Sequence, residues 1–114
     1  MEYNLEDRTV RFSENVIELC RKVPKDIITS PIISQLIRSG TSIGANYREA
    51  NGASSKRDFK NKIHICKKEG KETMYWVQLL GKSVIGESTR EKCRDTWKEA
   101  KELTLIFSKI AKNS

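Results

Sequence analysis

The sequence has few of the residues that break helices and few that fill large cores. Only two of its 114 residues are proline, six are glycine, and aromatic residues make up 7%. No apolar run approaches the roughly 18 residues that a membrane span needs. The first residues, MEYNLEDR, are acidic and polar, unlike the start of a secretory signal. We therefore expect a soluble, cytoplasmic protein with no membrane partner.

Cysteine and histidine are scarce as well. The three cysteines, Cys20, Cys66 and Cys93, are far apart and form no CxxC motif. An odd number without that motif argues against a disulfide framework and against a zinc site. His64 is the only histidine, and the lysines around it would repel a metal cation. We expect buried free thiols in a reducing compartment, with no metal and no cofactor.

What remains is a polar chain with a modest apolar fraction. Hydrophobic residues make up 37% of the chain and charged residues 32%. The length fits one domain, residues 1–114. Because little apolar side chain is available for a thick core, thin helical architectures and oligomers are favoured.

The spacing of apolar residues predicts four helices joined by short loops. Apolar positions recur three, four and seven residues apart, and the β-branched residues fall in the same helical phase, so no strand is indicated. We expect an all-α, up-down-up-down antiparallel four-helix bundle, with three helices and a flexible fourth as the alternative. The predicted helices span about residues 5–22, 31–51, 55–85 and 89–112.

Local signals predict where these helices begin and end. Proline stops a helix, short polar side chains cap its first turn, and glycine suits a left-handed end. The expected signals are Pro24 after the first helix, Ser30 with Pro31 at the start of the second, Gly52 as its left-handed C-cap, Ser55 at the start of the third, and Gly86 followed by a Ser88–Glu91 capping box before the fourth.

Two glycines lie in the middle of the second predicted helix. Gly40 and Gly44 lower helix propensity, but together with Ala45 they keep that helix surface thin. We therefore expect a neighbouring helix to approach closely at these positions.

Positive charge is concentrated on the third predicted helix. The net charge is +7, and residues 55–82 hold eight basic but only three acidic side chains. A row of lysines suits a phosphate backbone, and such binding weakens steeply with salt. The alternative is a solvated helix face, although such faces usually mix charges of both signs. The basic row consists of Lys56, Arg57, Lys60, Lys67, Lys68 and Lys71.

A polar stripe runs along the second predicted helix beside its apolar side. A catalytic interpretation would use its glutamate as a base and its arginine as an anion clamp. However, the sequence offers no nucleophile, metal cluster or phosphate loop to act with them, so we expect no enzyme and no small-molecule substrate. We favour hydrogen bonds across helices or subunits that fix their register. The polar stripe consists of Gln35, Arg38, Ser42, Asn46 and Glu49.

Some apolar residues lie outside the predicted core stripes. They are either extra core or subunit contacts. We favour subunit contacts, because one apolar seam per helix already fills a four-helix interior and surplus apolar patches mark interfaces. These residues are Ile65, Trp76 and Leu79 on the third helix, with Val10 and Ile17 on the first.

Several motifs together resemble a known family. They are similar to the four-helix bundle proteins encoded in 23S rRNA intervening sequences, once labelled ribosomal proteins, and to the accessory proteins of diversity-generating retroelements. Tyr47, Arg48 and Ala50 depart from the common pattern, as does the lysine-rich third helix. The motifs are Val-Pro-Lys at 23–25, Gln-Leu-Ile-Arg-Ser at 35–39, Ser-Ile-Gly-Ala-Asn at 42–46, Glu49, and Ser55 with Asp58-Phe59.

The resemblance implies a bundle that assembles as a ring-shaped homopentamer and performs no catalysis. For the retroelement branch it also implies binding to nucleic acid and to a reverse transcriptase, whereas the intervening-sequence branch has no settled role. We therefore predict a non-enzymatic, basic adaptor for RNA or DNA, with a reverse transcriptase as a candidate partner. The alternative is a structural or protein-binding oligomer whose charge serves solubility.

Overall fold

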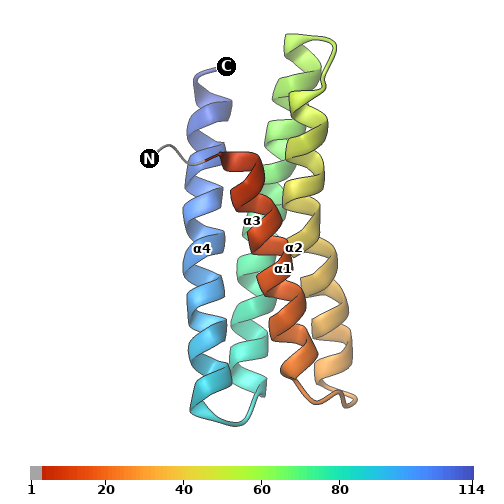
Figure 1. Ribbon diagram of the computed structural model, residues 1–114, viewed down its shortest axis with the longest axis vertical. Coiled ribbons are helices and arrows are strands. Elements are labelled where there is room, and N and C mark those ends of the chain that lie inside the picture. Colours follow the sequence, from red (N-terminus) through yellow and green to blue (C-terminus); the bar gives the residue numbers. More distant parts are fainter. Residues whose placement is uncertain (1–3) are drawn as a thin grey trace.

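The chain folds into four helices joined by short connections (Figure 1). The structure is a computed structural model that describes residues 4–114; residues 1–3, which begin the polar N-terminal segment discussed above, lie outside the described part. No strand occurs within residues 4–114, so the all-α prediction is confirmed. The helices are α1 (Leu5–Lys22), α2 (Thr29–Asn51), α3 (Lys56–Ser83) and α4 (Glu87–Lys112).

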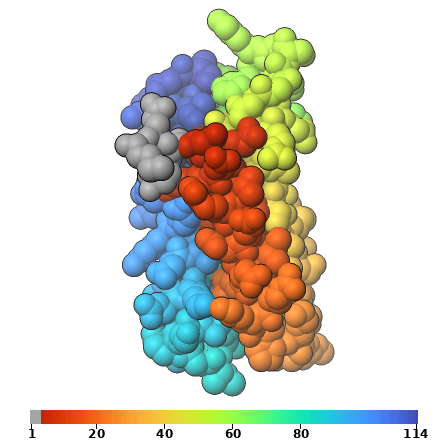
Figure 2. All heavy atoms as spheres, viewed as in Figure 1, coloured from red at the N-terminus to blue at the C-terminus, as the bar shows by residue number. Residues whose placement is uncertain are grey.

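Helices that follow one another in the chain also pack together in space. α2 packs against α1 and α3, and α3 packs against α4, while the contact between α1 and α4 is smaller. In Figure 1 the α1–α2 and α3–α4 connections lie at one end of the molecule and the α2–α3 connection at the other. Figure 2 shows α1 lying over one face of the bundle, between α4 and α2. Within residues 4–114, no helix is both long and apolar enough to cross a membrane.

The core is formed by apolar side chains from all four helices. Burial of one such side chain contributes roughly 1.5–3 kcal/mol relative to leaving it in water. The rings of Tyr47 and Phe107 add an aromatic contact with centroids 5.4 Å apart. The largest apolar side chains with no exposed surface are Val16, Leu36, Ile43, Ile63, Val77, Leu80, Leu103 and Phe107.

The three cysteines are buried free thiols, as predicted. Burial, together with the nearby Cys93, raises the pKa of Cys20 to about 11. Burial likewise raises the pKa of Cys66 to about 12 and that of Cys93 to about 11. All three thiols therefore stay protonated at neutral pH and behave as small apolar side chains.

Glycines let the outer helices approach the central pair. A Cβ atom on Gly40 would lie 3.0 Å from Val16 Cγ2 of α1. A Cβ on Gly44 would lie 3.1 Å from the hydroxyl oxygen of Thr9, also on α1. The predicted close approach at these two glycines is therefore confirmed, and α1 is the helix that approaches. On α3, a Cβ on Gly70 would overlap the hydroxyl of Thr104 on α4.

The predicted N-cap of α2 is wrong. The helix begins at Thr29, one residue before Ser30, and the side chain that caps it belongs to Asp26. One Asp26 carboxylate oxygen accepts the backbone N–H groups of Ile28 and Thr29, each at 2.8 Å. The Thr29 hydroxyl donates to the Pro24 carbonyl at 2.8 Å and so closes the loop. These bonds satisfy the first free N–H groups of the helix before Ser30 is reached.

Two further predicted helix ends are wrong, and one is confirmed. α4 begins at Glu87 with Gly86 as its N-cap at φ 102°, and no side chain caps it, so the Ser88–Glu91 capping box does not form. Gly52 ends α2 at φ −98°, not in the left-handed region. By contrast, the Ser55 hydroxyl accepts the Asp58 N–H at 3.0 Å, as predicted for the start of α3.

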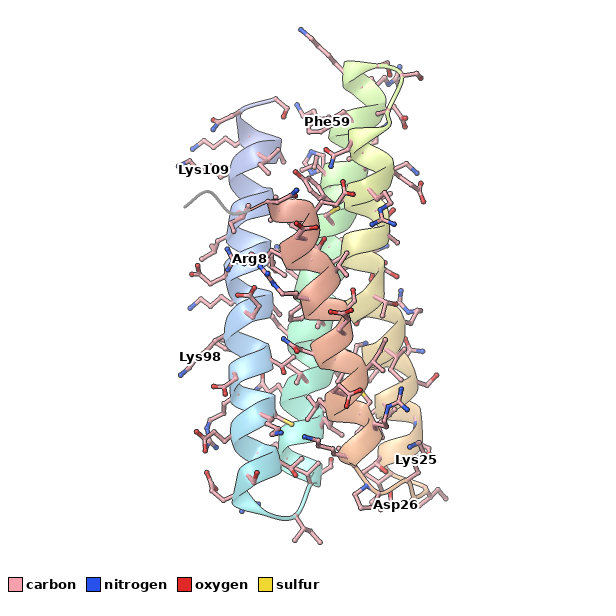
Figure 3. All side chains as sticks on the ribbon, in the orientation of Figure 1. Arg8, Lys25, Asp26, Phe59, Lys98 and Lys109 are labelled. Atoms are coloured by element: carbon pink, nitrogen blue, oxygen red, sulfur yellow. The ribbon has the colours of Figure 1, made fainter. Side chains whose placement is uncertain are left out.

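We predict that Asp26→Ala lowers the melting temperature, whereas Ser30→Ala leaves it unchanged (Figure 3 labels Asp26 at the α1–α2 connection). Hydrogen bonds from the Thr29 and Ile28 N–H groups lower the pKa of Asp26. The stabilisation is therefore complete above the pKa of the unfolded carboxyl, about 3.9, and is lost as the pH falls through the lower folded pKa. Circular-dichroism melts between about pH 2 and 7 should show the wild type and Asp26→Ala converging only in acid. A larger loss in Ser30→Ala would contradict this assignment of the cap.

Gly70→Ala should destabilise the bundle by about 1–3 kcal/mol, because the added methyl group overlaps the Thr104 hydroxyl. Adding Thr104→Ala removes the obstacle, so the double variant should recover part of that loss in urea unfolding. Gly52→Ala is the control, since its Cβ would meet only backbone oxygens at 3.8 Å and 3.9 Å. Strictly additive losses from Gly70→Ala and Thr104→Ala would show that the two positions do not touch.

Candidate nucleic-acid interface

The basic row lies along the outer side of α3. Ile63, Cys66 and Val77 turn the opposite side of this helix into the core, where all three have no exposed surface. Ser55 fixes the first turn of the helix and so sets the phase of the residues that follow. As a result Lys56, Arg57, Lys60, Lys68 and Lys71 are exposed, and Lys67 is half-buried.

None of the six residues in the basic row forms a salt bridge with a carboxylate in the described part of the chain. Some cations elsewhere do form them: Lys62, on the α2 side of the same helix, binds Glu49 at 2.8 Å. Arg8 of α1 likewise binds Glu99 of α4 at 2.7 Å. The excess of positive charge seen in the sequence is therefore also an excess of unpaired charge on the surface.

Part of the basic row borders a hollow of about 830 Å³ at the end of the molecule where α2 connects to α3. The first turn of α3 lies here, with free backbone N–H groups and the positive end of the helix dipole. Asn113 and Ser114, after α4, close the other side. The remaining lining residues are Ala53, Ser54, Ser55, Lys56, Arg57, Phe59 and Lys60. Lys67, Lys68 and Lys71 lie outside the hollow, further along α3.

Arg38 links the polar stripe of α2 to α3. Its Nη1 atom donates to both carboxylate oxygens of Glu69, at 3.2 Å and 3.3 Å, and its Nη2 atom donates to Glu72. Its Nε atom donates to Gln35 at 3.3 Å. Glu69 is only 8% exposed, so its charge is held almost inside the bundle by one guanidinium group.

The other members of the polar stripe divide between two roles. Glu49 bridges to Lys62 of α3. Ser42 and Asn46 instead donate to backbone carbonyls of their own helix, one turn earlier. The stripe therefore links α2 to α3 through Arg38 and Glu49 and not along its whole length.

The apolar patch of α3 meets this network. The Trp76 Nε1–H group donates to Glu72 at 3.2 Å, and the Tyr75 ring packs edge-on against Trp76 with centroids 4.9 Å apart. Ile65, Trp76 and Leu79 are all half-buried. We call this surface, formed by Arg38, Glu69, Glu72, Ile65, Trp76 and Leu79, the α2–α3 face. Val10 and Ile17, 38% and 37% exposed, lie apart from it on α1.

The neighbours of Glu72 on the α2–α3 face determine the pKa of its carboxyl group. Burial raises the pKa of Glu72, but hydrogen bonds from Trp76 and Arg38, together with the charges of Arg38 and Lys68, outweigh it. The pKa of this carboxyl therefore lies below its usual value, and Glu72 stays charged at neutral pH.

Sequence analysis missed Glu69 and Glu72 as partners of Arg38. The available signal was their position: both lie in the middle of the lysine-rich helix, and Glu69 adjoins Gly70 on the apolar seam. A buried acidic residue needs a cation, and Arg38 is the basic residue in the middle of the preceding helix. Among residues 4–114, no group of three or more His, Cys, Asp or Glu residues could hold a metal ion.

Comparisons with known proteins agree with the first part of the predicted resemblance, which concerns the intervening-sequence proteins. Residues 2–109 match the sequence model of a family described as 23S rRNA-intervening sequence protein. A similar solved structure is a protein of unknown function from the S23 ribosomal protein family of Bacteroides thetaiotaomicron, 33% identical in sequence, with a TM-score of 0.79. The match covers 96% of this chain and 99% of that chain. No curated protein matches the chain.

Proposed function

The chain belongs to the family of 23S rRNA-intervening sequence proteins, and from this premise we propose that it is a non-enzymatic, oligomeric adaptor that binds RNA or DNA through the basic row of α3. The observation that carries the proposal is that no residue of this row forms a salt bridge with a carboxylate within residues 4–114. Cations that a fold uses for its own stability are often paired, as Lys62, Arg38 and Arg8 are. Six cations without a salt bridge on one side of one helix fit an anionic partner.

The geometry of the basic row fits a strand of phosphates. At a rise of 1.5 Å per residue, Lys56 and Lys71 are about 22 Å apart along α3. One strand of a duplex presents a phosphate every 3.4 Å or so along its axis, so the row spans about six phosphates. Five of the six residues are lysine, which acts as a point charge and contacts phosphate without reading bases. The proposed binding is therefore independent of base sequence.

Charge reversal within the basic row tests this proposal. In Lys60→Glu/Lys67→Glu/Lys71→Glu, the affinity for a labelled oligonucleotide should fall at least about tenfold. The slope of log affinity against log salt concentration should also decrease in magnitude by roughly two to three, because up to three phosphate contacts are lost. Fluorescence anisotropy between about 50 and 300 mM salt measures both quantities.

The matched control for that test is Arg11→Glu/Lys22→Glu/Lys25→Glu, which changes the net charge equally at exposed positions outside α3. It should keep most of the affinity and nearly the full salt dependence. If wild type shows no salt-sensitive binding, or if the two triple variants bind equally well, the proposed role of the basic row is wrong.

We also propose that the protomer is an up-down-up-down bundle and that it assembles into a homopentameric ring through the α2–α3 face. Connections that alternate between the two ends in Figure 1 support the first point. Half-buried Trp76 and Leu79 beside Arg38 support the second, because tryptophan and arginine are enriched at interfaces. In a ring the basic row is repeated on every subunit, so weak phosphate contacts add up through multivalency.

Light scattering tests the assembly. The wild type should have five times the chain mass of 13.1 kDa, and Leu79→Glu on the α2–α3 face should shift it toward monomer. Leu105→Glu is the control, since Leu105 lies on α4 and is 55% exposed. A wild-type mass of 13.1 kDa would rule out the ring.

The α2–α3 face also favours a second candidate function, which is a protein-binding or structural oligomer without a nucleic-acid role. Because the chain resembles retroelement accessory proteins, a reverse transcriptase is the candidate partner for this second function. Pull-downs with and without nuclease separate the two functions. A set of partners that survives nuclease treatment supports protein binding, and the basic row then serves solubility.

A further inference from the structure

A second hollow lies between α3 and α4, outside the basic row and outside the α2–α3 face. Its volume is about 590 Å³, and its lining comes from these two helices alone. Part of the lining is apolar: Val77 and Gly81 of α3, with Cys93 and the half-buried Trp97 of α4. Gly81 faces Cys93 here, and a Cβ on it would lie 3.4 Å from Cys93 Cβ, which is an ordinary contact distance. We call this feature the α3–α4 hollow.

The polar part of the lining is strongly basic. Lys82 comes from α3, and Arg90, Arg94 and Lys98 come from α4, spaced four residues apart so that they share one side of that helix. Figure 3 shows Lys98 projecting outward from α4. Glu87 forms salt bridges with Arg94 at 2.5 Å and with Arg90 at 3.5 Å, and the charges of Glu91 and Asp95 also act on Arg94. The hollow therefore keeps a net positive charge after its own ion pairs are counted.

The α3–α4 hollow continues the line of the basic row. Lys60, Lys71 and Lys82 recur every eleven residues, which is about three helical turns, so they lie along the same side of α3. Lys82 borders the hollow about 16 Å beyond Lys71. A phosphate chain that follows the basic row in this direction therefore arrives at the hollow.

Trp97 gives the hollow a surface on which a flat ring can stack. Base–aromatic stacking tolerates any base, because every base has a π-face. The Lys101 ammonium lies over one face of the Trp97 ring, 5.4 Å from its centroid, so a base stacks only where Lys101 does not cover the ring. Gln78 supplies an amide that can both donate to and accept from the edge of a base.

We propose that the α3–α4 hollow takes up one unstacked base of a single-stranded nucleic acid whose phosphates follow α3. This inference rests on the proposed nucleic-acid function and adds the class of nucleic acid. A duplex can lie on the basic row, but its bases are paired and stacked, so none is free to enter the hollow. A flipped-out base covers the exposed part of the Trp97 ring, while the phosphates on either side of it meet Lys82, Arg90, Arg94 and Lys98.

Two simpler occupants fit less well. A free phosphate would meet the cations but leave the exposed part of the Trp97 ring uncovered. An apolar peptide would cover this ring but leave Lys82 and Lys98 without an anion. A base joined to phosphates satisfies both parts of the lining at once, and the volume lies within the roughly 300–1,000 Å³ of typical ligand pockets.

The two tryptophans of the chain provide the test, because one lies in the hollow and the other lies on the α2–α3 face. Trp76→Phe leaves Trp97 as the only tryptophan, and Trp97→Phe leaves Trp76. Titration with a short oligothymidylate should quench the fluorescence of the Trp76→Phe protein by base stacking. It should leave the Trp97→Phe protein nearly unchanged. A duplex of the same length should quench neither protein.

An affinity measurement makes the test independent of fluorescence. Trp97→Ala should weaken binding of the single strand roughly tenfold to a hundredfold, while duplex binding, which uses the basic row, should remain. The triple lysine-to-glutamate variant of the basic row should weaken both. Circular dichroism checks that Trp97→Ala is as helical as wild type, and the two phenylalanine variants keep the test informative if it is not.

The outcomes separate this inference from the proposed function. Equal affinity for single strand and duplex, with no quenching of Trp97, overturns the base-binding hollow and leaves the basic row as the site. Quenching by thymidine monophosphate as strong as that by the oligonucleotide overturns the strand proposal in favour of a mononucleotide pocket. Failure of wild type to bind any nucleic acid removes both proposals.

Discussion

The close packing of α3 against its two neighbours is the constraint on which the surface of this protein depends. On one side, the buried Thr73 hydroxyl donates to Ser39 of α2 at 3.0 Å, and on another, Gly70 lies directly against Thr104 of α4. Neither contact tolerates a larger side chain. With two sides of the helix committed in this way, only its outer side remains for side chains that need water. The lysines lie on that side because the packing leaves them no other.

The same packing separates the charges of α3 by sign. Glu69 and Glu72 lie toward α2, where Arg38 forms salt bridges with both, while no residue of the basic row forms a salt bridge with a carboxylate within residues 4–114. Lys68 is the member of the row nearest to this acidic side, since it is four residues before Glu72 and its charge lowers the pKa of that carboxyl. The positions of Glu69, Glu72 and Arg38 therefore leave most of the positive charge of α3 on one side of the helix.

The helices and their buried sides were predictable because burial follows the 3.6-residue period, and the basic row followed from the same phase. The cap of α2 was not predictable. Asp26 caps this helix in place of Ser30 because a hydrogen bond between Thr29 and Pro24 closes the loop, and local propensity does not encode that bond. The α3–α4 hollow was not predictable either. It is lined by residues from two helices, from Gln78 of α3 to Lys98 of α4, and the period of one helix does not encode its register against the other.

The proposed assembly and the proposed nucleic-acid binding are compatible on this fold because they use mostly different sides of α3. Trp76 and Lys71 are five residues apart, which places them about 140° apart around the helix axis. A subunit that docks on the α2–α3 face would therefore leave Lys71 and the α3–α4 hollow open to solvent, whereas Lys68, which is eleven residues before Leu79 and so on the same side of the helix, would lie beside the docked subunit. A ring built this way would carry a basic row on every protomer, so a long strand could contact several protomers at once. Weak contacts with each protomer would then suffice, because a strand bound to one basic row meets the next row at a high effective concentration.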